Sequence, residues 1–520
     1  MNNNLFKHTT ASTMLKHTSI VPGDNMLLPE YDELDAIGLA EKIKAKEISP
    51  LEALDAAVER IDSRNPSLNA VVLKLYNRAH SRLPLLSKGS LYGVPFLLKD
   101  LKAALIGTPT TNASKLTKNY LPKENSILVE RYEAAGLQII GKTNTPEFGI
   151  MGVTEPLLYG PCRNPWNTDH TPGGSSGGAS AAVSSRMVPI AHAGDGGGSI
   201  RIPASCCGLF GIKPTRGRVS QAPYKGESWG GFVQENVVSR SVRDSAALLD
   251  IADPITPGEP YAAPHKERSW LEETQREPGK LRIAFDMDTL FGKDNHPECK
   301  KAVQHTISLL QKLGHDVVEA RPKFSKEDLI KAYFLTVATG TARFVEETSA
   351  YAGVRPKAKN FEAATWLLAQ IGWNCSAPEL LKSQADIQKS GRDVAVFFQQ
   401  HDIFLTSTTA TPPVEIGSQN PTTAERLQLG LIQKTNLSVI LDFALKVMGT
   451  SRISTYPNTQ LFNITGQPAM SVPLYWTPNG LPIGSQLVGR FGDEATLFRL
   501  AAQLEKEQPW AHRKPPMLKL

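Results

Sequence analysis

The sequence is poor in cysteine, and none of its cysteines is placed as an evident metal ligand or disulfide partner. Five cysteines occur in 520 residues, an odd number, and no CxxC spacing joins any two of them. His296 and Cys299 lie three residues apart, but two potential ligands do not make a zinc site. We therefore expect no bound metal, and reduced, mostly buried thiols in a cytoplasmic protein. The cysteines are Cys162, Cys206, Cys207, Cys299 and Cys375.

Long apolar runs and clusters of basic residues are also missing. No segment reaches the roughly 18 consecutive apolar residues that a membrane-spanning helix needs. The net charge of +6 is spread over the whole chain, which is too dilute to indicate binding to nucleic acid or to an anionic membrane. The first 23 residues contain no acid and no arginine, and they lack the apolar core of a secretory signal. We expect residues 1–30 to form a disordered tail and residues 31–520 to form the folded part.

Helix-like and strand-like segments alternate along the folded part. Ser49 followed by Pro50 and Glu52 is typical of a helix start. This alternation predicts an α/β fold in which helices cover a sheet that contains parallel strands. Helices are expected over 35–65 (interrupted at 49–50), 125–135, 241–253, 299–314, much of 325–400 and 493–507. Strands are expected over 68–75, 94–98, 137–140, 281–288, 315–320, 402–407, 461–474 and 481–489.

A phosphate-loop pattern occurs at Gly136, Gly141, Lys142 and Thr143. That loop needs flexible residues with free amides, followed by a helix. Here the four intervening residues are Leu-Gln-Ile-Ile, which predict a strand, and Pro146 disfavours a helix immediately before it. We therefore reject a nucleotide site at this position.

Residues 170–213 contain two serines set among glycines, Ser175 and Ser199. Gly173 to Gly177 satisfies G-x-S-x-G, the nucleophile elbow of α/β-hydrolases, which would make Ser175 the nucleophile and require a downstream histidine. Ser199 instead follows three glycines, whose amides can converge on one negative charge. Such donors can stabilise the oxyanion of acyl transfer. Both interpretations remain open at this point.

The base for such chemistry is not evident among the histidines. His192 lies within a strand-like run, where a structural role is the simpler interpretation. Lys99 follows the apolar run 94–98, and burial there could lower its pKa enough for it to act as a base, with Ser175 passing the proton between Lys99 and Ser199. Asp195 and Arg201 flank the glycine turn, and we expect them to form an internal ion pair.

These motifs together resemble the amidase signature family. The stretches that carry the resemblance are GVPFLLKD, GKTNTPEFG, GGSSGGASAA, GDGGGSIRIPASCCGLFGIKPTRG and NITGQPAMSVPL. The resemblance implies a Ser-cisSer-Lys triad, with Ser199 as nucleophile, Ser175 as bridge and Lys99 as base, and no metal or organic cofactor. It implies an oxyanion hole made by the backbone amides of Gly196, Gly197, Gly198 and Ser199. It also implies one amidase signature domain over 31–520, with a mixed, mostly parallel sheet covered by helices on both faces.

The expected activity is hydrolysis of a small-molecule amide by a monomer or homodimer, without nucleic acid or membrane. Within the family, four short sequence stretches most resemble bacterial amidases of the 6-aminohexanoate-cyclic-dimer hydrolase type: LLKDL, KTNTPE, RNPWN and SIRIPAS. The family often has Thr-Pro-Thr where this chain has Thr406-Ser407-Thr408, so the substrate stays open. The alternative is a glutamine-amidase subunit of a tRNA-dependent amidotransferase, which would require partner chains.

Overall fold

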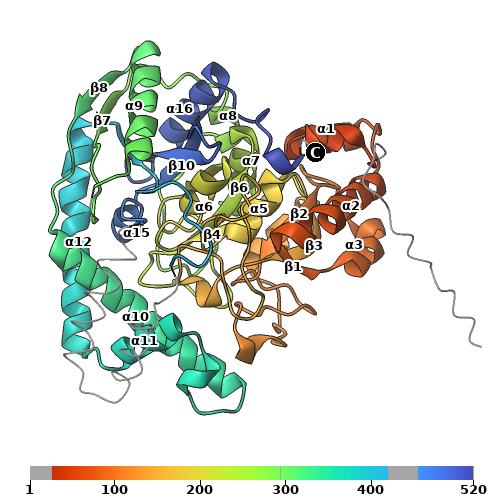
Figure 1. The fold of residues 1–520 in the computed structure, drawn as a ribbon, viewed down its shortest axis with the longest axis horizontal. Helices are drawn as coiled ribbons and strands as arrows, with labels where there is room; N and C mark the ends of the chain where they lie inside the picture. Colours follow the sequence, from red (N-terminus) through yellow and green to blue (C-terminus); the bar gives the residue numbers. More distant parts are fainter. Residues whose placement is uncertain (1–25, 293, 420–454, 519–520) are drawn as a thin grey trace, which may run out of the picture.

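A single sheet organises the molecule. The computed structural model describes residues 26–292, 294–419 and 455–518. These residues contain an 11-stranded sheet with the order β1-β3-β2-β4-β6-β5-β10-β11-β9-β7-β8 (Figure 1). The strands are β1 (Val71–Lys74), β2 (Pro95–Lys99), β3 (Gln138–Thr143), β4 (Ile190–Asp195), β5 (Phe210–Lys213), β6 (Gln234–Ser239), β7 (Arg282–Phe285), β8 (Asp316–Glu319), β9 (Ile403–Ser407), β10 (Ala469–Trp476) and β11 (Pro482–Gly489).

The sheet is mixed, as predicted. β2 pairs in parallel with β3 and β4, and β7 pairs in parallel with β8 and β9. The pairs that join these two groups, from β4 through β6, β5, β10 and β11 to β9, are antiparallel, and so is the β1–β3 pair. Parallel pairing is thus a smaller part of the sheet than the helix–strand alternation of the sequence predicts, because strands returning beside one another, such as β10 and β11, fill its middle.

The predicted helix start at Ser49 is confirmed. Ser49 and Glu52 form a reciprocal capping box at the start of α2, and Ser241 accepts the Asp244 amide at the start of α7. The helices are α1 (Ala36–Lys44), α2 (Pro50–Leu68), α3 (Tyr76–Arg82), α4 (Ile127–Ala134), α5 (Gly177–Ser184), α6 (Arg201–Cys207), α7 (Val242–Ala252), α8 (Trp270–Glu273), α9 (Pro297–Lys312), α10 (Lys326–Tyr351), α11 (Ala363–Trp373), α12 (Ala377–Gln400), α15 (Gln460–Thr465) and α16 (Glu494–Glu507).

Helices cover both faces of the sheet, and β11 shows this directly. A Cβ built on Gly484 would lie 3.0 Å from the Cβ of Ser205 in α6. The next residue, Ser485, places its hydroxyl 2.7 Å from that of Thr306 in α9. Because consecutive strand residues point to opposite faces, α6 and α9 lie on opposite sides of the sheet. The predicted layers of helix, sheet and helix are confirmed.

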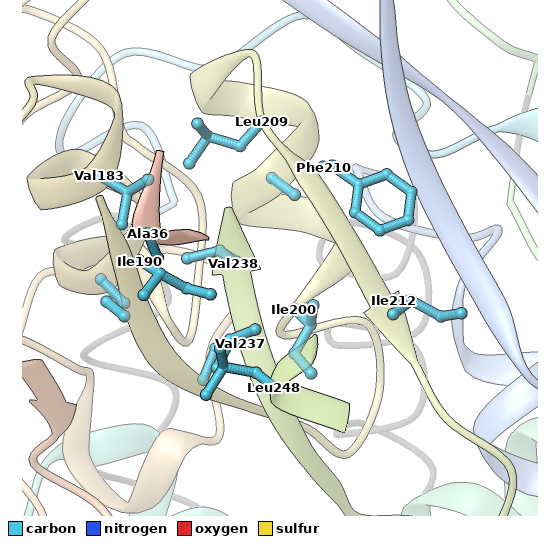
Figure 2. Close-up of a cluster of buried hydrophobic side chains, with 14 of the residues drawn as sticks. Ala36, Val183, Ile190, Ile200, Leu209, Phe210, Ile212, Val237, Val238 and Leu248 are labelled. Atoms are coloured by element: carbon cyan, nitrogen blue, oxygen red, sulfur yellow. The ribbon is translucent and has the colours of Figure 1, made fainter. Parts of the chain in front are cut away.

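The hydrophobic core holds the two strands that flank Ser199. Figure 2 shows Ile190 of β4 and Phe210 of β5 among buried side chains that include Val238 of β6, Val183 of α5 and Leu248 of α7. Burying one such side chain stabilises the fold by about 1.5–3 kcal/mol. The segment 196–209, which begins after β4 and ends before β5, is therefore anchored at both ends.

Two boundary predictions need correction. The stretch 461–474 was expected to be a strand, but residues 460–465 form α15, which ends at Gly466 with φ of 92°, and β10 begins only at Ala469. A short apolar run does not distinguish a buried helix from a strand. The expected helix end at Asn65–Pro66 is also too early: α2 continues to Leu68 and ends at Asn69 with φ of 51°. A proline this close to the helix end removes one backbone hydrogen bond without breaking the helix.

The phosphate-loop pattern lies in a strand, as the analysis of the sequence predicted. Gly141, Lys142 and Thr143 belong to β3, and the Lys142 ammonium donates to the Pro109 carbonyl at 2.6 Å and to the Thr110 hydroxyl at 2.8 Å. These amides pair with neighbouring strands, so they do not form a phosphate cradle.

Most of the predicted N-terminal tail lies outside the described residues, which begin at Met26. Leu27 donates its amide to Glu59 at 2.8 Å, and Arg60 donates to the carbonyls of Leu27 and Leu28 at 2.9 and 3.0 Å. Residues 26–30 thus lie against α2. Within the described part of the chain, none of the helices combines the length and the apolar character that crossing a bilayer requires.

Candidate active site

Lys99 ends β2 inside the protein, between β3 and β4 in the sheet. The residue is 1% exposed. Its ammonium nitrogen donates to the hydroxyls of Ser175 at 2.7 Å and Ser176 at 3.0 Å, and to the Gly194 carbonyl at 3.4 Å. The expected contact between Lys99 and Ser175 is present across 76 residues of sequence.

The surroundings of Lys99 favour its neutral form. Burial lowers the pKa of Lys99 to about 7, against the opposing effect of the Glu235 carboxylate and with a further lowering by the Lys102 charge. A lysine with a pKa near 7 is about half neutral at neutral pH, so it can accept a proton there. This is the electrostatic condition that the sequence-based hypothesis required.

Ser175 sits in a turn that glycines make possible. The peptide bond between Gly174 and Ser175 is cis, and Ser175 is 2% exposed. α5 begins at Gly177, where the next glycine packs tightly: a Cβ on Gly178 would lie 2.4 Å from the amide nitrogen of Asn144. Only glycine fits such a close backbone approach. The glycines of this motif therefore bring the turn down onto β3 and aim the Ser175 hydroxyl at Lys99.

Ser199 lies in the glycine turn between β4 and α6, and Asp195 organises that turn. The Asp195 carboxylate accepts the amides of Gly198 at 2.7 Å and Ile200 at 3.2 Å. Gly198 has φ of 128°, a conformation that glycine adopts without strain. Because the Gly198 amide is already bonded, the predicted oxyanion hole must be corrected: Gly198 shapes the turn and does not offer its N–H to a ligand.

The amides of Gly196, Gly197 and Ser199 have no hydrogen-bond partner among the described residues. Gly197 and the half-buried Ser199 line a cavity of about 110 Å³. The cavity walls are mainly aromatic and aliphatic and include Trp229, Tyr333, Phe334, Val337 and Tyr456. An apolar cavity with unbonded amides in a glycine turn suits the binding of a developing negative charge.

Ser175 borders the same cavity through Gly149. A Cβ on Gly149, which lines the cavity, would lie 3.2 Å from the Ser175 hydroxyl oxygen. Gly149 belongs to the long segment 143–167, which was expected to run into a cleft, and residues 149–153 of that segment do line it. The structure thus places Lys99, Ser175 and the cavity at Ser199 in one connected region.

Asp195 and Arg201 form the predicted internal ion pair. Both side chains are 0% exposed, and Arg201 donates to the two carboxylate oxygens of Asp195 at 2.9 and 3.0 Å. Arg201 also donates to the Thr459 carbonyl at 2.9 Å and to the side chains of Asn463 and Gln486 at 2.6 Å each. Although burial alone would raise it, the pKa of Asp195 is held well below its usual range by Arg201 and Asn463. The pair fixes the glycine turn to the C-terminal part of the chain.

Comparison with known proteins places the chain in a family. The family model described as "Amidase" matches residues 52–498. The chain belongs to the amidase signature family.

Two kinds of relative accompany this match. The amidase is 34% identical over 491 residues to a 6-aminohexanoate-cyclic-dimer hydrolase of Pseudomonas sp. (strain NK87), covering 93% of this chain and 97% of the relative. A solved structure of 6-aminohexanoate cyclic dimer hydrolase complexed with substrate has a TM-score of 0.87 at 33% identity, covering 94% of this chain and 99% of that one. A bacterial aryl acylamidase has a TM-score of 0.81 at 25% identity, covering 92% and 97%. This amidase is therefore a hydrolase of amides, acting on carbon–nitrogen bonds other than peptide bonds.

His192 has a structural place in this amidase. Its Nδ1 accepts the backbone N–H of Lys99 at 3.3 Å, and its Nε2 lies 3.2 Å from the Glu235 carboxylate. An accepting Nδ1 places the ring proton on Nε2, facing Glu235. The Ser175 hydroxyl accepts its hydrogen bond from Lys99. This geometry does not favour a nucleophile-elbow mechanism in which His192 is the base for Ser175.

The analysis of the sequence missed three residues at the site: Ser176, Glu235 and Tyr333. Ser176 was the neighbour of a chosen serine, and its hydroxyl both accepts from Lys99 and donates to the Gly194 carbonyl at 3.2 Å. Glu235 reaches the site only through the β4–β6 pairing, in which it lies opposite Gly194. Tyr333 belongs to α10, and its sequence position carries no motif. Only the serine could have been found from the local pattern.

Proposed function

We propose that this amidase hydrolyses small linear or cyclic carboxylic amides through an acyl-enzyme on Ser199, with Ser175 as proton relay and Lys99 as general base. One observation carries the proposal. A buried lysine whose pKa is lowered to about 7 lies 2.7 Å from the Ser175 hydroxyl, beside the cavity that Ser199 lines.

In the first half of the reaction, neutral Lys99 takes the proton of Ser175 as Ser175 takes that of Ser199. The Ser199 oxygen then forms a bond to the substrate carbonyl carbon, and the carbonyl π electrons move onto oxygen. The amides of Gly196, Gly197 and Ser199 would hold this oxyanion, each donor contributing roughly 3–4 kcal/mol to the barrier reduction.

Collapse of the tetrahedral intermediate breaks the carbon–nitrogen bond. The leaving nitrogen receives a proton back through Ser175 from protonated Lys99, and the acyl group stays on Ser199. Water then attacks the acyl carbon, with the same relay accepting its proton. The bond between the acyl carbon and Ser199 Oγ breaks, the relay returns the proton to Ser199 Oγ, and the carboxylic acid leaves. Lys99 returns to its neutral form, so the cycle balances without a cofactor.

The cavity supports a small, largely apolar substrate. It holds about 110 Å³ and is walled by side chains such as Trp229, Phe334 and Val337. The relatives named for a cyclic dimer of 6-aminohexanoate make cyclic amides of short aliphatic units the first class to try. We propose that the enzyme works as a monomer or homodimer without nucleic acid or membrane, and that its free thiols reflect a reducing cytoplasm.

The decisive experiment maps the nucleophile. A fluorophosphonate reacts with an activated serine, and peptide mass spectrometry of the labelled protein identifies that serine. We expect the label on Ser199, and we expect Ser199→Ala to lose both labelling and amide hydrolysis. Ser180→Ala is the matched control, because the buried Ser180 hydroxyl in α5 has no hydrogen-bond partner among the residues that the structure describes. This variant should keep both labelling and hydrolysis.

The outcome also separates the alternatives. A label on Ser175 with Ser199→Ala still active would replace this mechanism by a nucleophile-elbow mechanism. A panel of linear amides, cyclic amides, aryl amides and glutamine defines the substrate class. Turnover confined to glutamine, and only when partner chains co-purify, would point to an amidotransferase subunit.

A further inference from the structure

A second, larger cavity lies on the other side of the sheet from the Lys99 side chain. It holds about 400 Å³, and His192 and Glu235 form part of its wall. Leu97 of β2 pairs with Ala191 of β4, so Lys99 shares the face of Ala191 and Ala193, whereas His192 points to the opposite face. The cavity is therefore separate from the one that Ser199 lines, and the proposed hydrolysis does not use it.

Lys102 is a cation without a partner in this cavity. Its ammonium makes no hydrogen bond and no ion pair with any described residue, and its backbone adopts φ of 62°, which turns the chain at the end of β2. Glu235, the carboxylate that acts on it electrostatically, is engaged by His192 at 3.2 Å. Burial lowers the pKa of Lys102 to about 8, so the side chain is still mainly protonated at pH 7.

The two other cations of the cavity wall share one carboxylate. Arg343 donates to Glu347 at 2.7 Å, and Lys225 lies 3.7 Å from the same carboxylate and 3.9 Å from the centre of the Phe344 ring. The wall thus carries three cations against the carboxylates of Glu235 and Glu347. Of the three, Lys102 is the one with neither a hydrogen bond nor an ion pair to a described residue. A half-buried cation without an ion-pair partner is partly desolvated, a cost in free energy that an anionic ligand would offset.

Apolar side chains make up most of the rest of the wall. The wall includes the aromatic rings of Tyr120, Phe148, Tyr224, Phe344 and Tyr351. The Tyr224 hydroxyl donates its proton to the Glu124 carbonyl at 2.7 Å, so a ligand does not have to accept that hydrogen bond. A cavity of this size is within the range that encloses a small organic ligand.

We propose that this second cavity binds a monocarboxylate with an aryl or alkyl body, its carboxylate paired with the Lys102 ammonium and its body against the aromatic wall. A single negative charge matches the single unpaired cation. Glu235 and Glu347 in the same wall disfavour phosphate and other dianions by like-charge repulsion. This site is independent of the proposed roles of Ser199, Ser175 and Lys99.

Calorimetric titration with 4-phenylbutyrate, and with the uncharged 4-phenylbutanol as its match, tests the site in the full-length protein. We expect 4-phenylbutyrate to bind about 10-fold or more tightly than the alcohol, the increment of one charge-assisted hydrogen bond. Lys102→Met should lose that increment and Lys102→Arg should retain it. Lys118→Met, which removes an exposed lysine, should bind as the wild type does.

A crystal structure of the complex is the second readout, and it also guards against a Lys102→Met variant that does not fold. The carboxylate should lie within hydrogen-bond distance of the Lys102 ammonium. Equal affinity for acid and alcohol, unchanged affinity in folded Lys102→Met, or a ligand found in the cavity at Ser199 would each overturn the proposal. Fluorophosphonate labelling of Ser199 should leave the affinity unchanged, which keeps this test separate from that of the catalytic mechanism.

Discussion

Lys99 is a lysine buried away from water, and this burial determines its protonation. The residue is 1% exposed, and burial is the largest cause of its lowered pKa. In the proposed mechanism protonated Lys99 cannot accept a proton, so we expect the fraction of active free enzyme to fall as the pH drops below that pKa.

The pH profile of kcat/KM tests this directly. Because burial lowers the pKa of Lys99 to about 7, kcat/KM should rise about tenfold per pH unit on the acidic side and reach a plateau above about pH 8. Steady-state assays on any amide that the enzyme turns over measure the profile. Lys99→Met should be inactive at every pH, and a wild-type rate that stays flat from about pH 5 to 9 would exclude a lysine base.

At the site, the sequence predicted the contact between Lys99 and Ser175 that the structure contains, and the catalytic roles of these residues stay predictions. Lys99, Ser175 and Ser199 were identified because glycines and an apolar run flank them, and local chemistry is visible in local sequence. The use of the Gly198 amide by Asp195 was not visible, since it depends on how the turn folds back on its own first residue. The contact of Glu235 with His192 depends on the register of β4 against β6, which no local pattern specifies.

At the scale of elements, the glycine turn after β4 is set against α10. A Cβ on Gly197 would lie 2.2 Å from the Tyr333 hydroxyl oxygen, closer than any real contact. Tyr333 is thus the group that limits the space over the turn, and its hydroxyl is the clashing atom.

Gly197→Ala should therefore lower kcat/KM by about 10-fold or more, since displacing the turn by a few tenths of an ångström misaligns its amides. Adding Tyr333→Phe removes the clashing oxygen, so the double variant should recover part of the loss. Kinetics of the two single variants and the double variant form a double-mutant cycle. Additive losses, with no recovery, would show that Tyr333 does not set the position of the turn.

Elements with strong periodicity or capping residues were predicted well, and short apolar ones were not. α9 and α16 match their expected positions closely, because long amphipathic patterns constrain both type and extent. The misassigned α15 has six residues and is ended by a glycine, so its sequence QLFNIT fits a strand equally well. The strand order could not be predicted. β5 and β10, for example, pair although they lie more than 250 residues apart, and no local sequence pattern specifies which distant strands will pair.

At the scale of the whole molecule, Arg201 joins the glycine turn that holds Ser199 to three later parts of the chain: the residue before α15, α15 itself and β11. Its removal would leave the Asp195 carboxylate buried without its main counter-charge. Breaking one side of such a buried pair costs about 3–5 kcal/mol.

Arg201→Met should therefore lose about 3–5 kcal/mol of unfolding free energy and, in the fraction that remains folded, most of kcat. The control is Arg218→Met, which breaks another buried pair, that of Arg218 with Glu494 at 2.9 Å, away from the cavity. Urea denaturation and active-site titration separate the two effects. A stability loss in Arg201→Met with kcat per folded molecule like that of Arg218→Met would mean that the ion pair is needed for the fold alone.

The bonds of Arg201 also bear on when the enzyme becomes active during its own synthesis. A ribosome delivers Lys99, Ser175 and Ser199 well before it delivers Thr459, Asn463 and Gln486, the residues that Arg201 binds. A nascent chain therefore carries every reactive side chain while the turn that presents Ser199 still lacks its clamp. In the proposed mechanism, the turn that presents Ser199 therefore gains its full clamp only after β11 has been synthesised and has entered the sheet.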